Sequence, residues 1–142
     1  LTDVTGVQTC ALPISMCNTL LAHGDAPSNG ADLVFIGKVR DHSRGKTVLH
    51  IDYEIYDTMA LKELNKIADE ALAQWDTGRI LIVHRYGRVN IGEASIVIAV
   101  SSSHRDESYR SSRYIIDEIK KRVPIWKKEF YSDGSEWIGD RN

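Results

Sequence analysis

The sequence of 142 residues predicts an α+β domain with a mostly antiparallel sheet, two main helices and a small C-terminal β-hairpin. Three observations predict this fold. One segment alternates apolar and polar residues, and two longer segments repeat apolar residues at three- and four-residue steps. A turn dipeptide separates two short pairs of large apolar or aromatic residues near the C-terminus. Strands and helices interleave without the regular alternation of a doubly wound fold, which disfavours a Rossmann arrangement.

The first fifteen residues are expected to lie outside the fold. Residues 4–14 resemble the in-frame translation of a sequencing-library adapter, and Ser15 and Met16 follow. Residues 1–15 are therefore interpreted as a non-native, disordered stretch, with a genuine tail or edge strand as the alternative. A single domain is expected over residues 16–142. Within it, residues 17–31 predict a short helix that runs into a loop.

Four segments are expected to form strands before the closing hairpin. Residues 33–39 indicate a buried strand. In residues 49–55 the odd positions are apolar and the even ones polar, which is the period-two pattern of a half-buried strand. Two apolar runs, at 80–83 and 96–100, predict core strands that pair with each other. Asp133 and Gly134 then form a turn signal between Phe130-Tyr131 and Trp137-Ile138, which predicts the hairpin.

Two segments have the apolar spacing of amphipathic helices. Residues 58–75 carry one apolar stripe, and Asp57 or Thr58 is able to cap the start. The second helix is expected at 106–122, and Pro124 ends it because proline lacks a backbone donor and restricts the preceding residue. Its inner face is expected to hold Tyr109, Ser112, Ile116, Ile119 and Val123.

The composition is typical of a soluble globular protein, with 42% apolar and 27% charged residues. A net charge of −2 gives no global attraction to nucleic acid or to an anionic membrane. No apolar run approaches the roughly 20 residues of a membrane-spanning helix, and no signal peptide is recognisable, so the cytoplasm is expected. Cys10 and Cys17 form no Cys-x-x-Cys pair, so neither a metal site nor a disulfide framework is predicted.

Basic side chains gather at the ends of the expected elements, where sites are commonly built. Guanidinium groups bind phosphate through paired hydrogen bonds, and a lysine among other cations loses its proton more easily. The pattern therefore predicts a phosphorylated, anionic ligand. The residues concerned are Lys38, Arg40, His104, Arg105, Lys120 and Lys127.

Each of these positions has a simpler interpretation that the sequence leaves open. Lys120 and Lys121 could complement the dipole at the end of a helix, which for Lys120 is about as well supported as a role in a site. Lys127 and Lys128 could form a solvated edge, and His104-Arg105 could be a helix-entry loop. A binding module for phosphorylated ligands or nucleic acid would need a continuous basic face with interleaved aromatics. Carboxylates interrupt the positive charge at Asp41, Asp106, Glu118 and Glu129, which favours a discrete pocket.

Other chemistry-bearing residues give weaker patterns. The histidines at 42, 50 and 84 are scattered without metal-ligand spacing and are interpreted as structural or surface residues. Three serines at 101–103 precede His104, but no Gly-x-Ser-x-Gly elbow is present and no acidic partner can be assigned. No P-loop sequence occurs.

Several segments together resemble the MoaE family, the large catalytic subunits of molybdopterin synthase. They are residues 35–41, 83–87, 91–93, 104–105 and 120–129. The likeness covers roughly residues 18–139, and its most specific part is Pro-Ile-Trp-Lys-Lys-Glu with an upstream Gly-Lys-Val-Arg. The resemblance implies an α/β-hammerhead-like fold. The N-terminal strand usual in the family is expected to be replaced here by the adapter-like stretch.

The resemblance also implies an activity and partners. Sulfur would pass from the thiocarboxylated C-terminal Gly-Gly tail of a small ubiquitin-like subunit to cyclic pyranopterin monophosphate, giving the dithiolene of molybdopterin in molybdenum cofactor biosynthesis. No metal or redox cofactor is implied, because the steps are additions and eliminations. The large subunit would form a homodimer within a heterotetramer. The alternative is a non-catalytic phospholigand-binding or scaffold subunit of the same complex.

The family's site residues can be carried onto matching positions of this sequence. The resemblance assigns Lys120 as the leading catalytic residue and Lys127 as its partner. It implies that His104 and Arg105 reach the pocket of the neighbouring protomer. The substrate-binding residues that it implies are Lys38, Val39, Arg40, His104, Arg105, Lys128 and Glu129.

Overall fold

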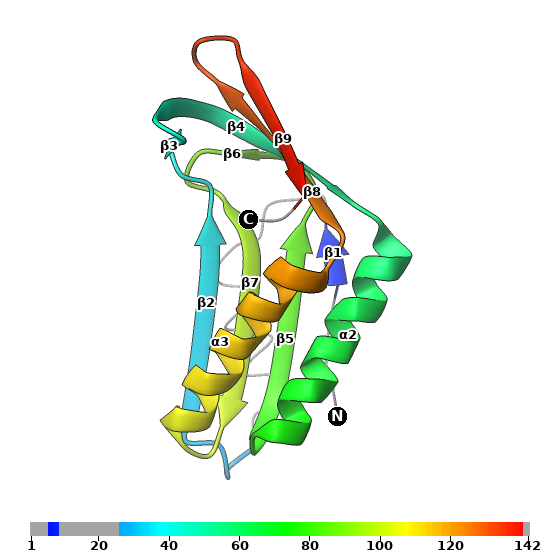
Figure 1. The fold of residues 1–142 in the computed structure, drawn as a ribbon. Helices are drawn as coiled ribbons and strands as arrows, with labels where there is room; N and C mark the ends of the chain where they lie inside the picture. The colour runs from blue at the N-terminus through cyan, green and yellow to red at the C-terminus, as the bar shows by residue number, and fades with distance from the viewer. Residues whose placement is uncertain (1–5, 9–25, 141–142) are drawn as a thin grey trace.

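The computed structural model describes residues 6–8 and 26–140 and has the expected α+β architecture. Two sheets lie end to end along the molecule, and two long helices cover one face of the larger sheet (Figure 1). The larger sheet has the strand order β1-β5-β7-β2. In the smaller sheet the order is β3-β4-β8-β9, and β6 pairs with β4. In the part of the chain that is described, no helix is long and apolar enough to cross a membrane.

Three long strands form most of the larger sheet: β2 (Ala31–Lys38), β5 (Thr77–Arg85) and β7 (Ala94–Ser102). β5 and β7 pair antiparallel, which confirms the predicted pairing of the two apolar runs. β2 lies at the edge next to β7, and its side chains are only partly buried, with Phe35 38% exposed. The prediction of a buried strand at 33–39 is therefore wrong in its burial, because an edge strand has one neighbour instead of two.

A short strand from the excluded N-terminal stretch completes the larger sheet. β1 (Gly6–Gln8) pairs parallel with the end of β5, with Val7 opposite His84. The expectation of disorder fails for these three residues, and the alternative of an edge strand holds there. A three-residue segment is too short for its sequence pattern to distinguish an edge strand from a tail. Most of the segment expected to form a short helix at 17–31 lies outside the described residues, and the chain turns between Ala26 and Asn29.

The two helices, α2 (Asp57–Gln74) and α3 (Arg105–Arg122), pack their apolar stripes on the larger sheet and on each other. The core between them and the sheet contains fully buried Leu64, Ile98 and Ile115. The N-cap of α2 is Tyr56, without a side-chain cap bond, so the capping expected from Asp57 or Thr58 is wrong.

The expected inner face of α3 is confirmed for Ser112, Ile119 and Val123, which are buried, and for Ile116, which packs against the core, but it is wrong at Tyr109. Tyr109 is 61% exposed, and the buried positions include Ser108 and Ser111 in the N-terminal half. The Ser108 hydroxyl forms a hydrogen bond with the Ser102 hydroxyl of β7. Small hydroxyl side chains allow the helix backbone to approach the sheet, whereas a tyrosine on that face would hold it away. The sequence pattern placed Ser112 correctly, but it favoured Tyr109 and missed Ser108 and Ser111.

The smaller sheet lies at one end of the larger one and supplies the remaining wall of the site. Its elements are β3 (His42–Ser43), β4 (Lys46–Ile55), β6 (Gly87–Asn90), β8 (Ile125–Tyr131) and β9 (Glu136–Asp140). β8 and β9 form the predicted hairpin around Asp133 and Gly134. The register of β4 against β8 shifts between Val48 and His50, so Val48 is buried and Leu49 is 52% exposed. The expected apolar alternation therefore fails at residue 49.

Candidate functional site

A cavity of about 510 Å³ lies where the larger sheet, the C-terminal half of α3 and the smaller sheet meet. This volume lies in the range typical of pockets for small organic ligands. Five cationic side chains and one carboxylate belong to its lining: Lys38, Arg40, Arg44, Lys120, Lys127 and Glu129. Positive charge is thus concentrated at this cavity, although the net charge of the chain is −2. Such a cavity favours an anionic ligand.

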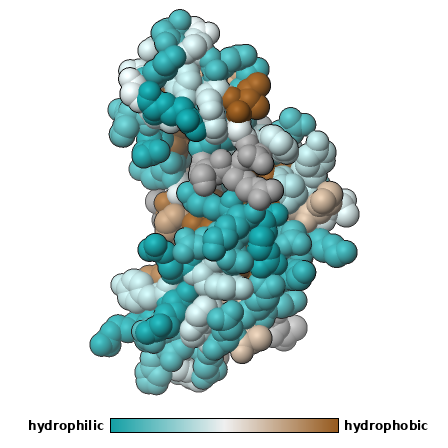
Figure 2. Space-filling view, viewed as in Figure 1, coloured by the Kyte–Doolittle hydropathy of each residue, from teal (hydrophilic) through white to brown (hydrophobic). Residues whose placement is uncertain are grey.

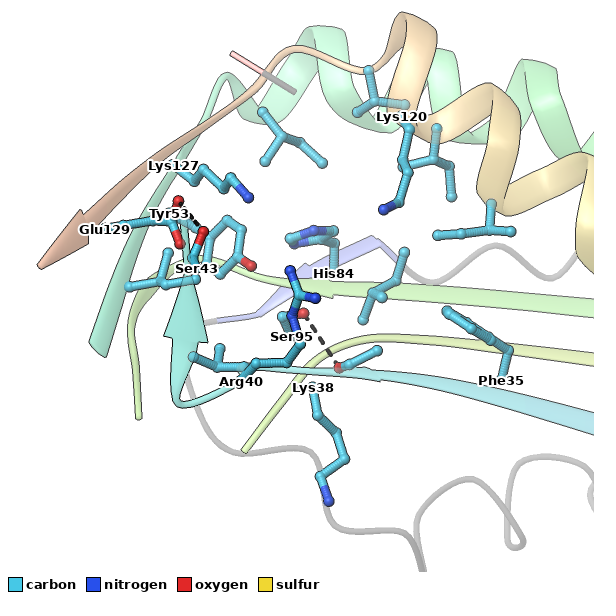
Figure 3. Close-up of a pocket in the computed structure, with 18 of the residues that line it drawn as sticks. Phe35, Lys38, Arg40, Ser43, Tyr53, His84, Ser95, Lys120, Lys127 and Glu129 are labelled. Atoms are coloured by element: carbon cyan, nitrogen blue, oxygen red, sulfur yellow. Dashed lines mark hydrogen bonds between the residues drawn. The ribbon is translucent and has the colours of Figure 1, made fainter. Parts of the chain in front are cut away.

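The end of β2 brings Arg40 into this cavity. The register of β2 against β7 shifts between Gly37 and Lys38, and the chain then leaves the larger sheet. Backbone hydrogen bonds of 3.1 Å to Glu93 and 2.9 Å from Gly92 hold Val39, whose side chain is buried. In Figure 3 the guanidinium of Arg40 points inward, whereas Lys38 at the rim points away from the other labelled side chains. Val39 therefore fixes the backbone from which Arg40 reaches the ligand space.

The end of α3 and the start of β8 supply the two lysines opposite Arg40. Lys120 lies in the last turn of α3, and β8 begins three residues after the helix ends. Alternate residues of a strand face opposite sides of a sheet, so Lys127 and Glu129 share the cavity side. Figure 3 shows Lys120 and Lys127 pointing into the same space from the two elements.

Lys128 is not brought into the cavity, because it faces the other side of β8. Its ammonium group lies 3.3 Å from a carboxylate oxygen of Glu136 and 5.1 Å from the centre of the Phe130 ring. These contacts hold it on the outer face of the hairpin. The resemblance placed Lys128 among the substrate-binding residues, but strand alternation separates it from Lys127 in this chain.

Glu129 is almost completely buried, and its carboxylate already has partners. The hydroxyl of Ser43 donates to it at 3.2 Å and the phenol of Tyr131 donates at 3.4 Å. The Arg44 guanidinium lies 3.9 Å away, stacked over the ring of Trp137 at 3.8 Å. A buried carboxylate needs such partners. Glu129 therefore holds the β3–β4 turn through Ser43 and Arg44, and its negative charge partly offsets the positive charge beside Lys127.

The surroundings of Lys127 lower the proton affinity of its side chain. Burial lowers its pKa from the ordinary value of 10.5, and the nearby charges of Lys120, Arg44 and Arg40 lower it further. The carboxylate of Glu129 opposes these effects. Desolvation and like charges both disfavour the ammonium form. Lys127 therefore gives up its proton more easily than an ordinary lysine does.

His104 and Arg105 lie at the opposite end of α3 from Lys120 and are absent from the cavity lining. At 1.5 Å per residue, the fifteen helical steps from Arg105 to Lys120 span roughly 22 Å. His104 and Arg105 therefore start from the far end of the helix, away from the cavity that Lys120 lines. The pair therefore contributes nothing to the cavity of its own chain.

Several lining residues were missed by sequence reasoning, and His84 is the most informative of them. The sequence pattern indicated a structural or surface residue at this position. It is buried, and it also forms part of the cavity wall. Tyr53 and Ser95 lie beside it on β4 and β7. The available signal was the position of His84 at the end of an apolar strand, where strands meet sites. A single histidine without the spacing of metal ligands gave no reason to assign it to a site.

Metal ligation has no support among the described residues, where no group of three or more histidine, cysteine or acidic side chains is close enough to hold an ion. The cavity instead offers hydrogen-bond donors and cations. These suit phosphate and other oxyanions.

Comparison with known proteins gives one consistent result. The model of the family described as "MoaE protein" matches residues 8–122. A molybdopterin synthase catalytic subunit from Halalkalibacterium halodurans is 48% identical over 115 residues, covering 81% of this chain and 74% of that protein. One from Bacillus subtilis is 46% identical over 112 residues, or 79% and 71%. The crystal structure of molybdopterin synthase from Staphylococcus aureus has a TM-score of 0.86 and 34% identity, with 96% of each chain covered.

Proposed function

The chain belongs to the MoaE family of molybdopterin synthase catalytic subunits, and on that premise we propose how it carries out the sulfur transfer. Sulfur passes from the thiocarboxylated C-terminus of a small ubiquitin-like subunit to cyclic pyranopterin monophosphate and gives the dithiolene of molybdopterin. The observation that carries the proposal is the cavity of about 510 Å³ with five cations and one engaged carboxylate. Its size suits a tricyclic pterin, and its charge suits the phosphate.

The cations divide the work of binding and chemistry. Arg40 points into the cavity and can bind phosphate oxygens through two parallel hydrogen bonds. Lys120 and Lys127 reach the ligand from the other side, where an ammonium group can stabilise negative charge that develops as sulfur adds to the pterin. Lys120 is the proposed catalytic residue, and Lys127 exchanges the proton because its pKa is lowered.

The enzyme is proposed to work as a homodimer in which each cavity is completed by its neighbour. The separation of His104 and Arg105 from Lys120 along α3 supports this arrangement, since the pair needs another copy of the chain to reach a cavity. Two small subunits would then make a heterotetramer in the cytoplasm. A structure from Helicobacter pylori, with 20% identity and a TM-score of 0.74, is described as a complex of subunits 1 and 2 of molybdopterin-converting factor.

Two substitutions test the proposed roles in a conversion assay with thiocarboxylated small subunit. Lys120→Ala should abolish product while leaving binding of the small subunit intact. Arg40→Ala should mainly raise KM for the pterin, on the order of tenfold or more, because it removes charged hydrogen bonds made before the chemical step. Lys121→Ala, on the exposed side of the same helical turn, is the matched control. Equal and mild losses for Lys120→Ala and Arg40→Ala would contradict the division of roles.

A further inference from the structure

His84 ends the apolar run of β5 and pairs with Ile96 of β7, so the rigid centre of the larger sheet fixes its position. The residue is 6% exposed and forms part of the cavity wall. Its Nδ1 lies 2.7 Å from the carbonyl oxygen of Arg85. A carbonyl oxygen only accepts hydrogen bonds, so Nδ1 must carry the proton in this contact. In the neutral ring, Nε2 is therefore left with a free lone pair.

The surroundings keep this imidazole neutral and oriented. Burial lowers the pKa of His84 to about 4, against the opposing effect of the hydrogen bond to Arg85. The ring of Tyr53 packs against it edge to face, with the centroids 5.3 Å apart. Within the described part of the chain, Nε2 makes no hydrogen bond. A neutral imidazole thus remains between the inward-pointing Arg40, Lys120 and Lys127 (Figure 3).

The other charged and imidazole groups of the described lining include one further acceptor inside the cavity, the Glu129 carboxylate. Arginine and lysine side chains only donate while they are charged. Ser43 and Tyr131 both donate to Oε1 of Glu129, so the acceptor capacity of Glu129 lies on Oε2, beside the cations of β8 and the β3–β4 turn. His42 pairs with Asp41 at the exposed rim, with 2.8 Å between Nδ1 and the carboxylate oxygen. His84 Nε2 is therefore the buried side-chain nitrogen in this lining that can accept.

From this geometry we propose that His84 Nε2 accepts a hydrogen bond from an N–H group of the ligand's heterocycle. The inference rests on the proposed function, because it takes a pterin as the ligand. The cations bind phosphate, but they cannot satisfy the N–H donors of a pyrimidine-type ring. An N–H buried without an acceptor is costly, so one fixed acceptor selects heterocycles that present a donor at this place. His84 thus contributes specificity for the ring, and Arg40 contributes affinity for the phosphate.

Two substitutions separate this role from a purely structural one. The amide nitrogen of asparagine can take the place of Nδ1 and donate to the Arg85 carbonyl, so His84→Asn keeps the internal bond and loses the acceptor. Glutamine reaches as far as Nε2 and can present its carbonyl oxygen there, so His84→Gln keeps an acceptor and gives up the internal bond.

The test compares KM and kcat for the pterin monophosphate in wild type and both variants, with thermal unfolding as a second readout. His84→Asn should keep a Tm close to wild type and raise KM by about tenfold. His84→Gln should recover most of that loss even if its Tm falls. Wild-type KM in His84→Asn, or equal losses in both variants, would overturn the proposal.

A spectroscopic measurement on the wild-type chain covers the case in which a variant does not fold. The ¹⁵N resonance of His84 Nε2 should have the position of an unprotonated nitrogen and should move upfield when the pterin monophosphate is added. Inorganic phosphate alone should leave it nearly unchanged, because phosphate carries no ring N–H. An Nε2 signal that ignores the pterin would overturn the proposal. A signal that responds in a chain that forms no product would leave the His84 contact standing and refute the sulfur transfer.

Discussion

Lys127 and Lys128 are neighbours in the sequence with opposite surroundings, and that contrast decides their roles. Lys127 faces the cavity beside Glu129, while Lys128 forms an ion pair with Glu136 outside it. A sequence pattern of two adjacent lysines does not say which of them faces inward. The phase of β8, which is set by its pairing with β4, makes that choice.

The lowered pKa of Lys127 gives a pH-dependent prediction. If Lys127 must be neutral to accept a proton, kcat should rise with pH to a midpoint below the ordinary lysine value of 10.5. The free energy of unfolding should also rise with pH. The pKa of Lys127 is lower in the folded chain than in the unfolded chain, so proton binding favours the unfolded chain, and this destabilisation disappears as pH rises. The check is a pH profile of kcat for wild type and Lys127→Arg.

The arginine variant keeps its charge over the whole pH range, so the rise should disappear with it. Lys66→Arg, on the exposed face of α2, is the control and should keep the wild-type profile. A Lys127→Arg enzyme with the same rising limb would show that another group titrates.

At the scale of elements, the helix α2 holds the larger sheet in place through a fully buried stripe. Leu64 has no exposed surface, whereas Met59 on the same helix is 62% exposed. Leu64→Ala should lower the free energy of unfolding by about 2–5 kcal/mol, because it removes buried surface and leaves a cavity. Met59→Ala should change it by less than about 0.5 kcal/mol. Urea unfolding of both variants measures the difference. Equal losses of unfolding free energy in the two variants would show that Leu64 is not part of the core.

The existence and order of the long elements could be predicted from the sequence, because helices and strands bury their apolar residues with different periods. Finer features depended on pairing partners that a local pattern does not contain. The edge position of β2, the bulge at Leu49 and the strand at Gly6–Gln8 are all consequences of which strand lies beside which. The serines of α3 that replace Tyr109 on the inner face are explained by close packing on β7.

The candidate site could be predicted in part for the same reason. Arg40, Lys120 and Lys127 carry charge at element ends, where the sequence draws attention to them, and the fold gathers them into one cavity. His84 is concealed within an apolar strand. Arg44 lies in the tight turn between β3 and β4 with a left-handed φ of 54°, lines the cavity and stacks over the ring of Trp137. His84 has only the weak signal of its place at the end of that strand, and the cavity position of Arg44 has no signature in local sequence.

At the scale of the whole molecule, the proposed shared cavity needs two copies of the chain. Figure 2 shows a mainly hydrophilic face over the helices, with hydrophobic colour confined to small areas. The feature that points to a dimer is instead the distance between the two ends of α3. His104 and Arg105 start the helix, and Lys120 lies in its last turn, at the cavity.

Mixing two inactive variants tests the shared cavity. Lys120→Ala and Arg105→Ala should each be inactive or nearly so, and a mixture that exchanges subunits should regain activity. In a mixed dimer one cavity carries both substitutions and the other carries neither, so random exchange restores about one quarter of wild-type activity. Failure to regain activity, with exchange demonstrated by mass spectrometry, would mean that the two residues do not act in one cavity.

The most direct test of the proposed sulfur transfer is the formation of molybdopterin by the full chain from cyclic pyranopterin monophosphate. The small subunit is supplied either with a C-terminal thiocarboxylate or with an ordinary carboxylate. Product should form only with the thiocarboxylate, and each product molecule should contain two transferred sulfurs. Binding of the pterin and the small subunit without product would contradict sulfur transfer and favour a scaffold role.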